Sequence, residues 1–250
     1  MTPLVLGFDI GGSLIKCAVV DITTGQTRTE PIQVPLPQPA TPTAVFAELR
    51  AALGREKWHG PVGVGYPGVV KNGFTLTGAH LDRSFIGLNW LDDLRKLTAQ
   101  PVALINDADA AGLAEIRFGA ARIFAAPDAG TVLLVTLGTG IGSALFHGGR
   151  LLPNTEFGHM LMGEREAEQW AAGSVRIREN LDWPAYGARV GRFLREMEKL
   201  VSPDLIVVGG GVSENFALFG PHIDIGCATV PAELGNRAGL IGAALAVTEE

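Results

Sequence analysis

The sequence predicts an α/β fold in which the same core is built twice. A strand, a glycine-rich turn and a second strand occur in GFDIGGSLIKCAVVD, residues 7–21, and again in VTLGTGIGSALFHGG, residues 135–149. Between the two copies, the apolar segment Val102–Ile105 leads directly into an Ala- and Leu-rich helix, Ala108–Glu115. Duplication of such a unit indicates two similar lobes that face each other across a cleft.

Composition narrows the class of protein. The chain has 250 residues, 47% of them hydrophobic, and a net charge of −6, so it lacks the general basic field that nucleic acids or membrane surfaces attract. Cys17 and Cys227 are too few for a disulfide framework or a cysteine zinc site, which favours a reduced, cytoplasmic setting. We expect neither a signal peptide nor a membrane span, because the start has no basic region and no apolar run approaches about 18 residues.

The first glycine turn is a candidate phosphate site. Leu4–Phe8 and Leu14–Asp21 read as strands, and the turn between them lacks the following helix that a Walker A loop or a dinucleotide fingerprint requires. Backbone N–H groups of Gly11, Gly12 and Ser13 can approach phosphate oxygens closely. Asp9 is placed to hold a metal–phosphate complex and Lys16 to add positive charge. The alternative is an ordinary hairpin turn with a solvated lysine.

The segment up to residue 98 extends the first lobe. Thr41 and Pro42 are typical of a helix start, and Val45–Arg55 carries helical spacing. The turn Gly63–Gly68 either lines a polar ligand through Gly65 and Gly68 or is purely structural. The other expected segments are a strand at Arg28–Val34, an extended proline run after it, a strand at Pro61–Gly65, an irregular region at Asn72–Trp90 and a helix at Leu91–Thr98.

Asn106 and Asp107 lie where an apolar strand ends and a helix begins. Ligands gather at the carboxyl ends of strands in such sheets, and a helix N-terminus there favours an ionised carboxylate. An ionised Asp107 can accept the proton of an attacking hydroxyl, the usual protein contribution to phosphoryl transfer onto an alcohol. The alternative is that Asp107 is only the N-cap of its helix.

The second lobe repeats the turn and adds polar residues. Thr131–Leu137 is an expected strand, followed by a turn containing Thr139 and Gly140, and the two turns together would clamp a phosphoryl donor. Glu156 and His159 can each bind vicinal sugar hydroxyls. Metal ligation by this pair is the alternative, although no further His or Cys follows closely.

The remaining segments alternate helices and strands. Gly209, Gly210 and Gly211 come between a strand and a helix start, where a phosphate chain can lie against backbone. The closing helix is expected to pack back on the first lobe. The expected elements are helices at Arg165–Gly173, Ser174–Glu179 and Trp183–Lys199, a strand at Leu205–Val208, a helix at Ser213–Phe219, a strand at Ile223–Val230 and a helix at Leu234–Val247.

Six motifs in order, DIGGSLIK, GYPGVV, INDADAAGLAE, TLGTGIGSALF, NTEFGH and VVGGGVS, resemble the ROK family of sugar kinases. The proline run and the short length are most similar to its polyphosphate-using glucokinase branch. The resemblance implies an actin-like, ribonuclease H-like fold with a small lobe of residues 1–106 joined by 238–250 and a larger lobe of residues 107–237. It also implies phosphoryl transfer to the 6-hydroxyl of glucose, Mg2+ with the donor, and a homodimer.

The resemblance assigns roles to individual residues. Asp107 would be the general base, and Asn106, Glu156 and His159 would bind sugar hydroxyls. Residues around the donor phosphates would be Asp9, Gly11, Gly12, Lys16, Thr139 and Gly140, with Gly209–Gly211 on the nucleotide side. The family's cysteine-rich zinc cluster is missing from Gly163–Asn180, as it is in the polyphosphate branch, so no zinc is expected. Only three residues precede Leu4 in the sequence, so we do not expect the DNA-binding helices of the family's repressors.

Two points stay open at this level. The donor is polyphosphate together with ATP, or ATP alone, and the difference depends on a basic track for which Lys71, Arg83, Arg117 and Arg122 are candidates. Mannose differs from glucose at one hydroxyl and stays a second candidate acceptor. A non-catalytic sugar sensor is the remaining alternative, but a sensor has no need of a base such as Asp107.

Overall fold

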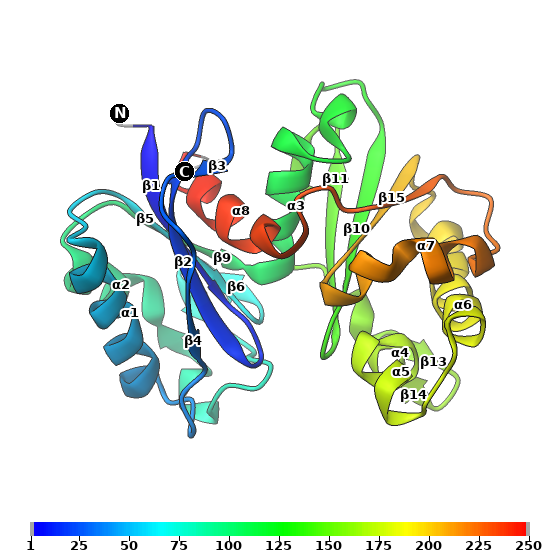
Figure 1. Cartoon of the computed structure of the whole chain (residues 1–250), viewed down its shortest axis with the longest axis horizontal. Helices are drawn as coiled ribbons and strands as arrows, with labels where there is room; N and C mark the ends of the chain where they lie inside the picture. Colours follow the sequence, from blue (N-terminus) through cyan, green and yellow to red (C-terminus); the bar gives the residue numbers. More distant parts are fainter. Residues whose placement is uncertain (1–2, 249–250) are drawn as a thin grey trace. The chain divides into compact units, whose positions relative to one another are not determined.

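A computed structural model describes residues 3–248 of the chain, which form two compact units (Figure 1). Unit 1 is Met1–Ala114 with Arg237–Glu250, and unit 2 is Glu115–Asn236. The expected lobes also include residues 1, 2, 249 and 250, which lie outside the described residues. Within residues 3–248, no helix combines the length and the apolar character needed to cross a membrane.

Unit 1 contains a six-stranded sheet in the order β3-β2-β1-β5-β9, with β4 also paired to β2. Strand β1 is antiparallel to β2 and parallel to β5, which is in turn parallel to β9. The strands are β1 (Leu4–Ile10), β2 (Leu14–Asp21), β3 (Gln26–Thr27), β4 (Ile32–Pro35), β5 (Val62–Tyr66) and β9 (Val102–Asn106).

Unit 2 contains a five-stranded sheet in the order β12-β11-β10-β15-β16. Here too an antiparallel hairpin, β10 with β11, is followed by parallel neighbours, β15 and then β16. The strands are β10 (Thr131–Leu137), β11 (Ile141–His147), β12 (Arg150–Leu152), β15 (Leu205–Gly209) and β16 (Thr229–Pro231). The repeated order and sense confirm the predicted duplication of an α/β core.

Eight α-helices are described in residues 3–248 (Figure 1). Thr41 caps α1 as predicted, since its Oγ1 accepts a hydrogen bond from the Ala44 N–H at 3.3 Å. The helices of unit 1 are α1 (Pro42–Glu56), α2 (Trp90–Thr98) and α8 (Ala238–Ala246), and α3 (Asp107–Phe118) begins in this unit. Those of unit 2 are α4 (Ala167–Ala171), α5 (Gly173–Arg178), α6 (Trp183–Val201) and α7 (Phe216–Phe219).

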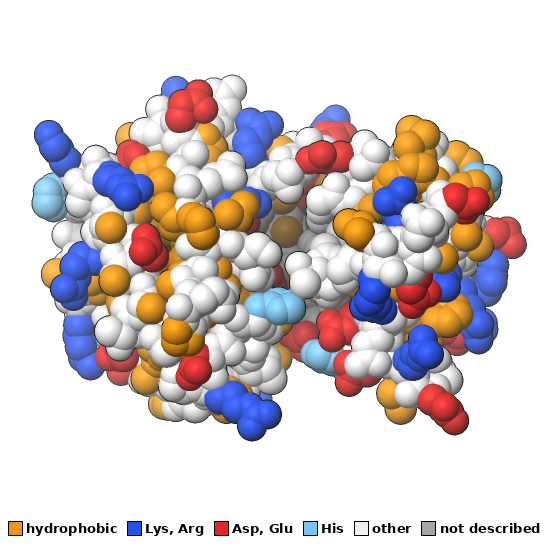
Figure 2. All heavy atoms as spheres, turned by 60° about the horizontal axis from the view of Figure 1, so that its bottom comes forward, with side chains coloured by type: hydrophobic (Ala, Val, Ile, Leu, Met, Phe, Trp, Pro, Cys, Tyr) orange, Lys and Arg blue, Asp and Glu red, His pale blue; other side chains and the backbone are white. Residues whose placement is uncertain are grey.

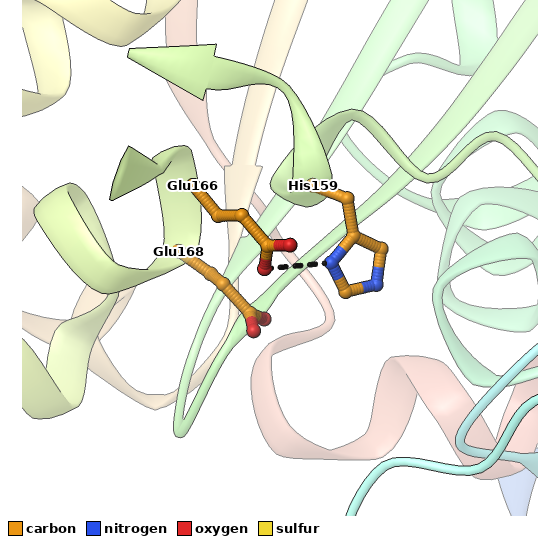
Figure 3. Close-up of side chains that lie close together, drawn as sticks. All are labelled: His159, Glu166 and Glu168. Carbon is orange, nitrogen blue, oxygen red and sulfur yellow. Dashed lines mark hydrogen bonds and ion pairs between the residues drawn. The ribbon is translucent and has the colours of Figure 1, made fainter. Parts of the chain in front are cut away.

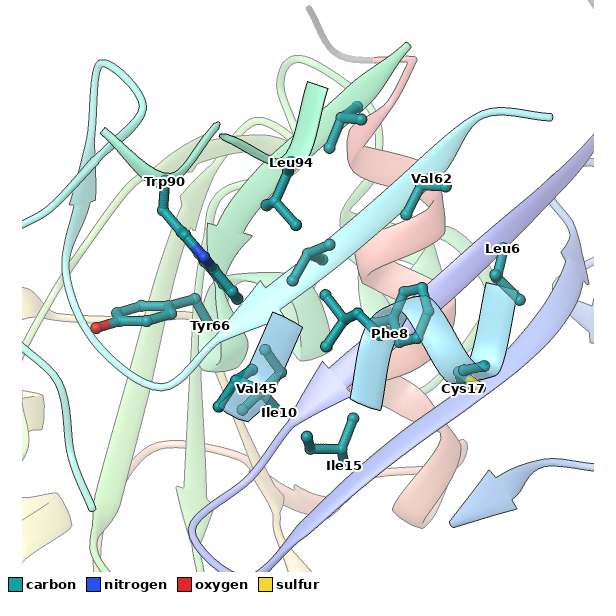
Figure 4. Packing of buried hydrophobic residues seen from close by; sticks show 14 of the residues in the cluster. Leu6, Phe8, Ile10, Ile15, Cys17, Val45, Val62, Tyr66, Trp90 and Leu94 are labelled. Carbon is teal, nitrogen blue, oxygen red and sulfur yellow. The ribbon is translucent and has the colours of Figure 1, made fainter. Parts of the chain in front are cut away.

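Each unit has its own apolar core. In unit 1, Leu6, Phe8 and Val64 of the sheet pack with Val45 and other apolar residues of the helices (Figure 4). In unit 2, strand residues such as Leu133 and Ile206 form a cluster with the α6 side chains Tyr186, Phe193 and Leu194. Burial of the apolar faces of these helices fixes them against their sheets.

Helix α8 belongs to unit 1, which confirms the predicted return of the C-terminal helix. Its approach to the sheet is so close that a Cβ at Gly63 would lie 1.8 Å from the Ala243 carbonyl oxygen. A Cβ at Gly242 would likewise lie 1.6 Å from the carbonyl oxygen of Ala110 in α3. Glycine at these positions allows the two backbones to come into direct contact. The sheet therefore packs closely on α8, and α8 packs closely on the start of α3.

The units divide within α3, between Ala114 and Glu115, whereas we predicted a lobe boundary after Asn106. The first half of α3 packs on α8 through Ala110. The Glu115 carboxylate instead accepts hydrogen bonds from the backbone N–H groups of Ala120, Glu233 and Leu234, all in unit 2. One helix therefore contributes to both compact units.

Several predicted elements need correction. The region Asn72–Trp90 is not irregular: it contains most of a three-stranded sheet of β6 (Val70–Lys71), β7 (Phe74–Thr75) and β8 (Leu88–Asn89). Asn72 and Gly73 both have positive φ, 52° and 81°, and form the two-residue hairpin turn between β6 and β7. The strand expected at Arg28–Val34 starts later, at Ile32, since Pro31 interrupts it.

Three further corrections concern unit 2. The predicted helix from Arg165 begins at Ala167, because Arg165–Glu166 form β14 and pair with β13 (Leu161–Met162). The last strand covers only Thr229–Pro231 of the expected Ile223–Val230. The expected helix Ser213–Phe219 is a 3-10 turn, Gly211–Asn215, followed by the four residues of α7.

Candidate active site

The β1–β2 hairpin of unit 1 carries Asp9 and Lys16 as directly opposed residues of the two strands. Lys16 Nζ lies 3.6 Å from Asp9 Oδ2, and the two side chains are 21% and 15% exposed. Burial raises the pKa of the Asp9 carboxyl above its ordinary value, and the positive charge of Lys16 opposes this shift. Lys16 is thus paired with Asp9. It is not simply solvated, as the alternative of an ordinary hairpin turn would have it.

The turn Gly11–Ser13 brings backbone to the surface between these strands. The Gly11 N–H donates to the Leu14 carbonyl oxygen at 2.9 Å, which closes the turn. A Cβ at Gly12 would lie 2.8 Å from Cδ2 of His80, so a side chain at this position would displace the imidazole. The turn keeps its main chain accessible because its glycines are small.

The carboxyl ends of three neighbouring parallel strands meet at this edge of unit 1. Asp9 of β1 is the register partner of Gly65 in β5, and Gly65 is the partner of Ile105 in β9. Asn106 and Asp107 follow Ile105 directly, and the Cα of Asp107 lies 3.8 Å from where a Cβ of Gly65 would be. The predicted residues Asp9, Gly65, Asn106 and Asp107 are therefore gathered at one end of the sheet, as parallel strands require.

Asn106, and not Asp107, is the N-cap of α3. Its Oδ1 accepts hydrogen bonds from the backbone N–H groups of Ala108, at 2.8 Å, and Asp109, at 3.0 Å. Its Nδ2 donates to the Gly68 carbonyl oxygen at 3.1 Å, which ties the cap to the turn after β5. Asp107 is the first helical residue and is partly buried, and its Oδ1 shares the Ala108 N–H with Asn106, at 2.8 Å. With the cap supplied by its neighbour, capping alone does not account for a carboxylate at position 107.

In unit 2, two glycine segments converge with the start of α5. The Gly138 N–H donates to the Gly140 carbonyl oxygen at 3.0 Å. Ser174 of α5 binds the same turn twice, through its N–H to the Gly138 oxygen at 3.0 Å and its Oγ to the Thr139 oxygen at 2.6 Å. The turn containing Thr139 and Gly140 is thus fixed by backbone and hydroxyl hydrogen bonds.

The second segment, Gly209–Gly211, follows β15, whose Gly209 pairs in register with Thr136 of β10. Gly210 has φ 80°, and a Cβ there would lie 2.5 Å from the Leu137 carbonyl oxygen. A side chain at position 210 is therefore disfavoured for two reasons: the positive φ, and the lack of space beside Leu137. We expected an α-helix N-terminus after these glycines, but a 3-10 turn follows them.

Glu156 is held by a serine of the second hairpin. Ser143 Oγ in β11 donates to the Thr155 carbonyl oxygen at 2.7 Å and accepts from the Phe157 N–H at 3.0 Å, which fixes the backbone on both sides of Glu156. Burial raises the pKa of the Glu156 carboxyl, and His159 opposes the shift. His159 Nε2 lies 3.8 Å from Glu156 Oε2, so the two predicted sugar-binding side chains do lie together.

Two further acids, Glu166 and Glu168, join His159 (Figure 3). The His159 Nδ1 is 3.1 Å from Glu166 Oε2, and this hydrogen bond raises the pKa of His159 above its ordinary value of 6.5. Ligand atoms of His159, Glu166 and Glu168 lie within 4.8 Å of one another, a spacing that can also hold a metal ion. Glu168 additionally approaches the glycine turn, since a Cβ at Gly140 would lie 2.6 Å from its Oε2.

The sequence interpretation missed Glu166 and Glu168. It placed both in one helix that begins at Arg165, whereas Glu166 is the last residue of β14 and Glu168 belongs to α4. The signal that was available is the tetrad Met162–Arg165, with Gly163 at φ 75°, which turns the chain between β13 and β14. That turn returns the chain toward His159.

Comparison with known proteins decides the family. The family model described as "ROK family" matches residues 5–174. The chain belongs to the ROK family. It is 45% identical over 241 residues to the polyphosphate glucokinase of Mycobacterium tuberculosis (strain CDC 1551 / Oshkosh), covering 96% of this chain and 89% of that protein.

Two solved structures resemble the whole chain. The inorganic polyphosphate/ATP-glucomannokinase of Arthrobacter sp. strain KM superimposes with a TM-score of 0.92 at 39% identity, covering 98% of each chain. The ROK family glucokinase of Streptomyces griseus, in complex with glucose and AMPPNP, gives a TM-score of 0.84 at 25% identity, covering 99% of this chain and 100% of that one. The predicted actin-like α/β fold of a sugar kinase is confirmed.

Proposed function

We propose that this ROK protein transfers a phosphoryl group from inorganic polyphosphate, and also from ATP, to the 6-hydroxyl of glucose. The observation that carries the proposal is the Asp107 carboxylate, placed by the Asn106 cap at the carboxyl end of β9 and beside the glycine segment of β5. The similarity to proteins named polyphosphate glucokinase and polyphosphate/ATP-glucomannokinase supports glucose as acceptor and polyphosphate as donor. We further propose that the protein acts in the cytoplasm as a homodimer.

In the proposed reaction Asp107 accepts the proton of the glucose 6-hydroxyl as its oxygen attacks the terminal phosphorus of the donor. Asn106, Gly65 and Gly68 contribute the neighbouring surface of the sugar site. Glu156 accepts hydrogen bonds from sugar hydroxyls, and His159 donates or accepts through Nε2. The donor phosphates lie against the backbone of Gly11, Gly12 and Ser13, with Lys16, and against Thr139 and Gly140, while Gly209–Gly211 border the nucleotide of ATP.

The residues present fit a Mg2+ ion bound with the donor. Asp9 offers carboxylate oxygens, the ligand type that Mg2+ prefers, and its side chain is 15% exposed. The ion would neutralise charge on the donor phosphates. We propose no zinc: among the described residues the cluster offers one histidine, two carboxylates and no cysteine.

A donor assay tests the function. Purified protein with Mg2+ and glucose receives polyphosphate or ATP at equal phosphoryl concentration, and glucose 6-phosphate is measured. We expect turnover with both donors and faster turnover with polyphosphate. Turnover with ATP alone would identify a strictly ATP-dependent glucokinase, and glucose binding without turnover on any donor would identify a sugar sensor. Mannose as acceptor, run in parallel, measures sugar selectivity.

We also propose that Glu166 positions His159. A carboxylate on Nδ1 fixes the orientation of the ring and directs Nε2 toward Glu156 and the sugar. As pH rises through the pKa of His159, Nε2 loses its proton and changes from donor to acceptor. Because Glu166 raises this pKa, the wild-type protein keeps the donor form to a higher pH than an unpaired histidine would.

Replacing Glu166 with glutamine removes the charge but keeps the size of the side chain. We expect the KM for glucose to rise several-fold, with a smaller change in kcat, and the pH at which KM changes to move downward. Histidine titration by NMR gives the same shift directly. The control is Glu164→Gln, an exposed glutamate of the same hairpin. A Glu166→Gln protein with an unchanged pH profile and unchanged KM would refute the positioning role.

A further inference from the structure

Four arginines lie on helices α5 and α6 of unit 2 and form what we call the arginine cluster: Arg176, Arg178, Arg189 and Arg192. Two of them donate hydrogen bonds to backbone carbonyl oxygens of α4. Arg178 Nη2 donates to the Gln169 oxygen at 3.2 Å, and Arg189 Nη1 donates to the Trp170 oxygen at 3.4 Å. Figure 2 shows Lys and Arg side chains interspersed with Asp, Glu and hydrophobic side chains on one face of the molecule.

Tryptophan rings hold the guanidinium groups of the cluster in place. The Arg189 and Arg192 guanidinium carbons lie 4.6 Å and 5.6 Å from the centre of the Trp170 ring. The Arg176 guanidinium lies 3.6 Å from the centre of the Trp183 ring. Stacked arginines lose less side-chain entropy when they bind, and their planar N–H groups match phosphate oxygens.

The cluster carries more positive than negative charge. Glu179 pairs with two of its members, at 2.6 Å from Arg189 and 3.6 Å from Arg178. Asp182, the N-cap of α6, is the other acid of the loop between α5 and α6. Among residues 3–248, Arg176 and Arg192 form no ion pair with a carboxylate. Residues 176–192 thus hold four arginines and two acids, in a chain whose net charge is −6.

Helix α5 connects this cluster with the glycine turn of the donor site. Its second residue, Ser174, bonds to both Gly138 and Thr139, and Arg176 and Arg178 follow two and four residues later. At about 1.5 Å per residue, the rise from Ser174 to Arg178 is about 6 Å. A phosphate chain that ends at the turn and runs along α5 therefore meets the cluster after a few phosphate units.

We propose that the arginine cluster binds the distal phosphates of an inorganic polyphosphate chain whose terminal phosphate lies at the Gly138–Gly140 turn. This inference rests on the proposed function, because it assigns a place to its polymeric donor. ATP has three phosphates and ends in a nucleoside, so it does not require the cluster. The four basic residues considered from the sequence were Lys71, Arg83, Arg117 and Arg122, and none of them belongs to it. Arg122 is paired with Glu233 at 2.9 Å.

The test is a double variant, Arg178→Gln with Arg192→Gln, which leaves the more buried Arg189 and Arg176 in place. We expect the KM for long-chain polyphosphate to rise about tenfold or more, since one charge-assisted hydrogen bond is worth about one order of magnitude. The KM values for ATP and tripolyphosphate should change little, and kcat should stay the same. The salt dependence of the long-chain KM should also weaken, because fewer phosphate contacts release counterions.

The matched control is Arg195→Gln with Lys199→Gln, two basic residues of α6 that pair with Asp224 and Glu196. It makes the same change in net charge outside the cluster, so the long-chain KM should stay near the wild-type value. Equal losses in the control and in the cluster variant would overturn the proposal, as would equal losses with ATP and with long polyphosphate.

Equilibrium binding of fluorescently labelled long-chain polyphosphate separates this inference from the proposed function. If the wild-type protein binds the polymer but does not use it as a donor, and the cluster variant loses the binding, the function fails and the cluster assignment stands. If the wild-type protein uses the polymer and the cluster variant uses and binds it equally well, the function stands and the cluster assignment fails.

Discussion

Replacing Asp107 with asparagine is expected to lower kcat by about two to four orders of magnitude with either donor, the usual contribution of a general base. Asparagine keeps the size and polarity of the side chain but cannot accept the proton of the sugar hydroxyl. Glucose binding should remain largely intact, because Glu156 and His159 are unchanged. Steady-state kinetics and calorimetric titration with glucose measure the two quantities separately.

The Asp107→Asn substitution should change activity without unfolding the protein. Asn106, which caps α3, is untouched, so loss of the Asp107 charge at the helix start should cost no more than about 1 kcal/mol of stability. The control is Asp92→Asn, which likewise removes a carboxylate from the first turn of a helix, but from the exposed side chain of Asp92 in α2, outside the proposed site. The Asp92→Asn protein should keep wild-type turnover. Near-normal turnover of Asp107→Asn would show that the base is another group.

Local signals in the sequence were sufficient for much of the fold. Thr41 followed by Pro42 fixed the start of α1, because capping and the missing N–H of proline act within one turn. The two strand–turn–strand units were recognisable because each lies in about fifteen consecutive residues. The dipeptide Asn72-Gly73 carried an equally local hairpin signal, and the interpretation overlooked it, so the sheet β6-β7-β8 was missed although it was predictable.

The residues that escaped prediction depend mainly on contacts that a local pattern does not specify. Asn106 and Asp107 are adjacent and both suit an N-cap. Both accept from the Ala108 N–H, and only the further hydrogen bond from the Asp109 N–H assigns the cap to Asn106. Glu166 reaches His159 because a hairpin with strands of two residues folds the chain back, and such short strands have no periodicity to detect. The arginine cluster likewise assembles from helices α5 and α6 through their packing around Trp170 and Trp183.

The substitution Gly242→Ala in α8 is expected to have the largest effect on stability. Its new Cβ would lie 1.6 Å from the Ala110 carbonyl oxygen, and backbone on both sides leaves no flexible side chain to give way. Overpacking of this kind costs about 1–3 kcal/mol and more where backbone must move. We expect a clear drop in the midpoint of urea unfolding, and a drop in turnover, because the α3 segment that α8 contacts begins with Asp107.

Gly54→Ala in α1 is the matched control, since it makes the same substitution inside a helix. No atom beyond its chain neighbours and its own helix backbone lies within 4 Å of the added Cβ, so the only effect is on the conformational freedom of the unfolded chain. Alanine should therefore stabilise the protein there by about 0.5–1 kcal/mol. Opposite signs for the two variants would show that contact with α3, and not helix propensity, requires glycine at position 242. If both variants were stabilising, α8 would not pack on α3 as closely as we describe, and its support of the Asp107 helix would have to be abandoned.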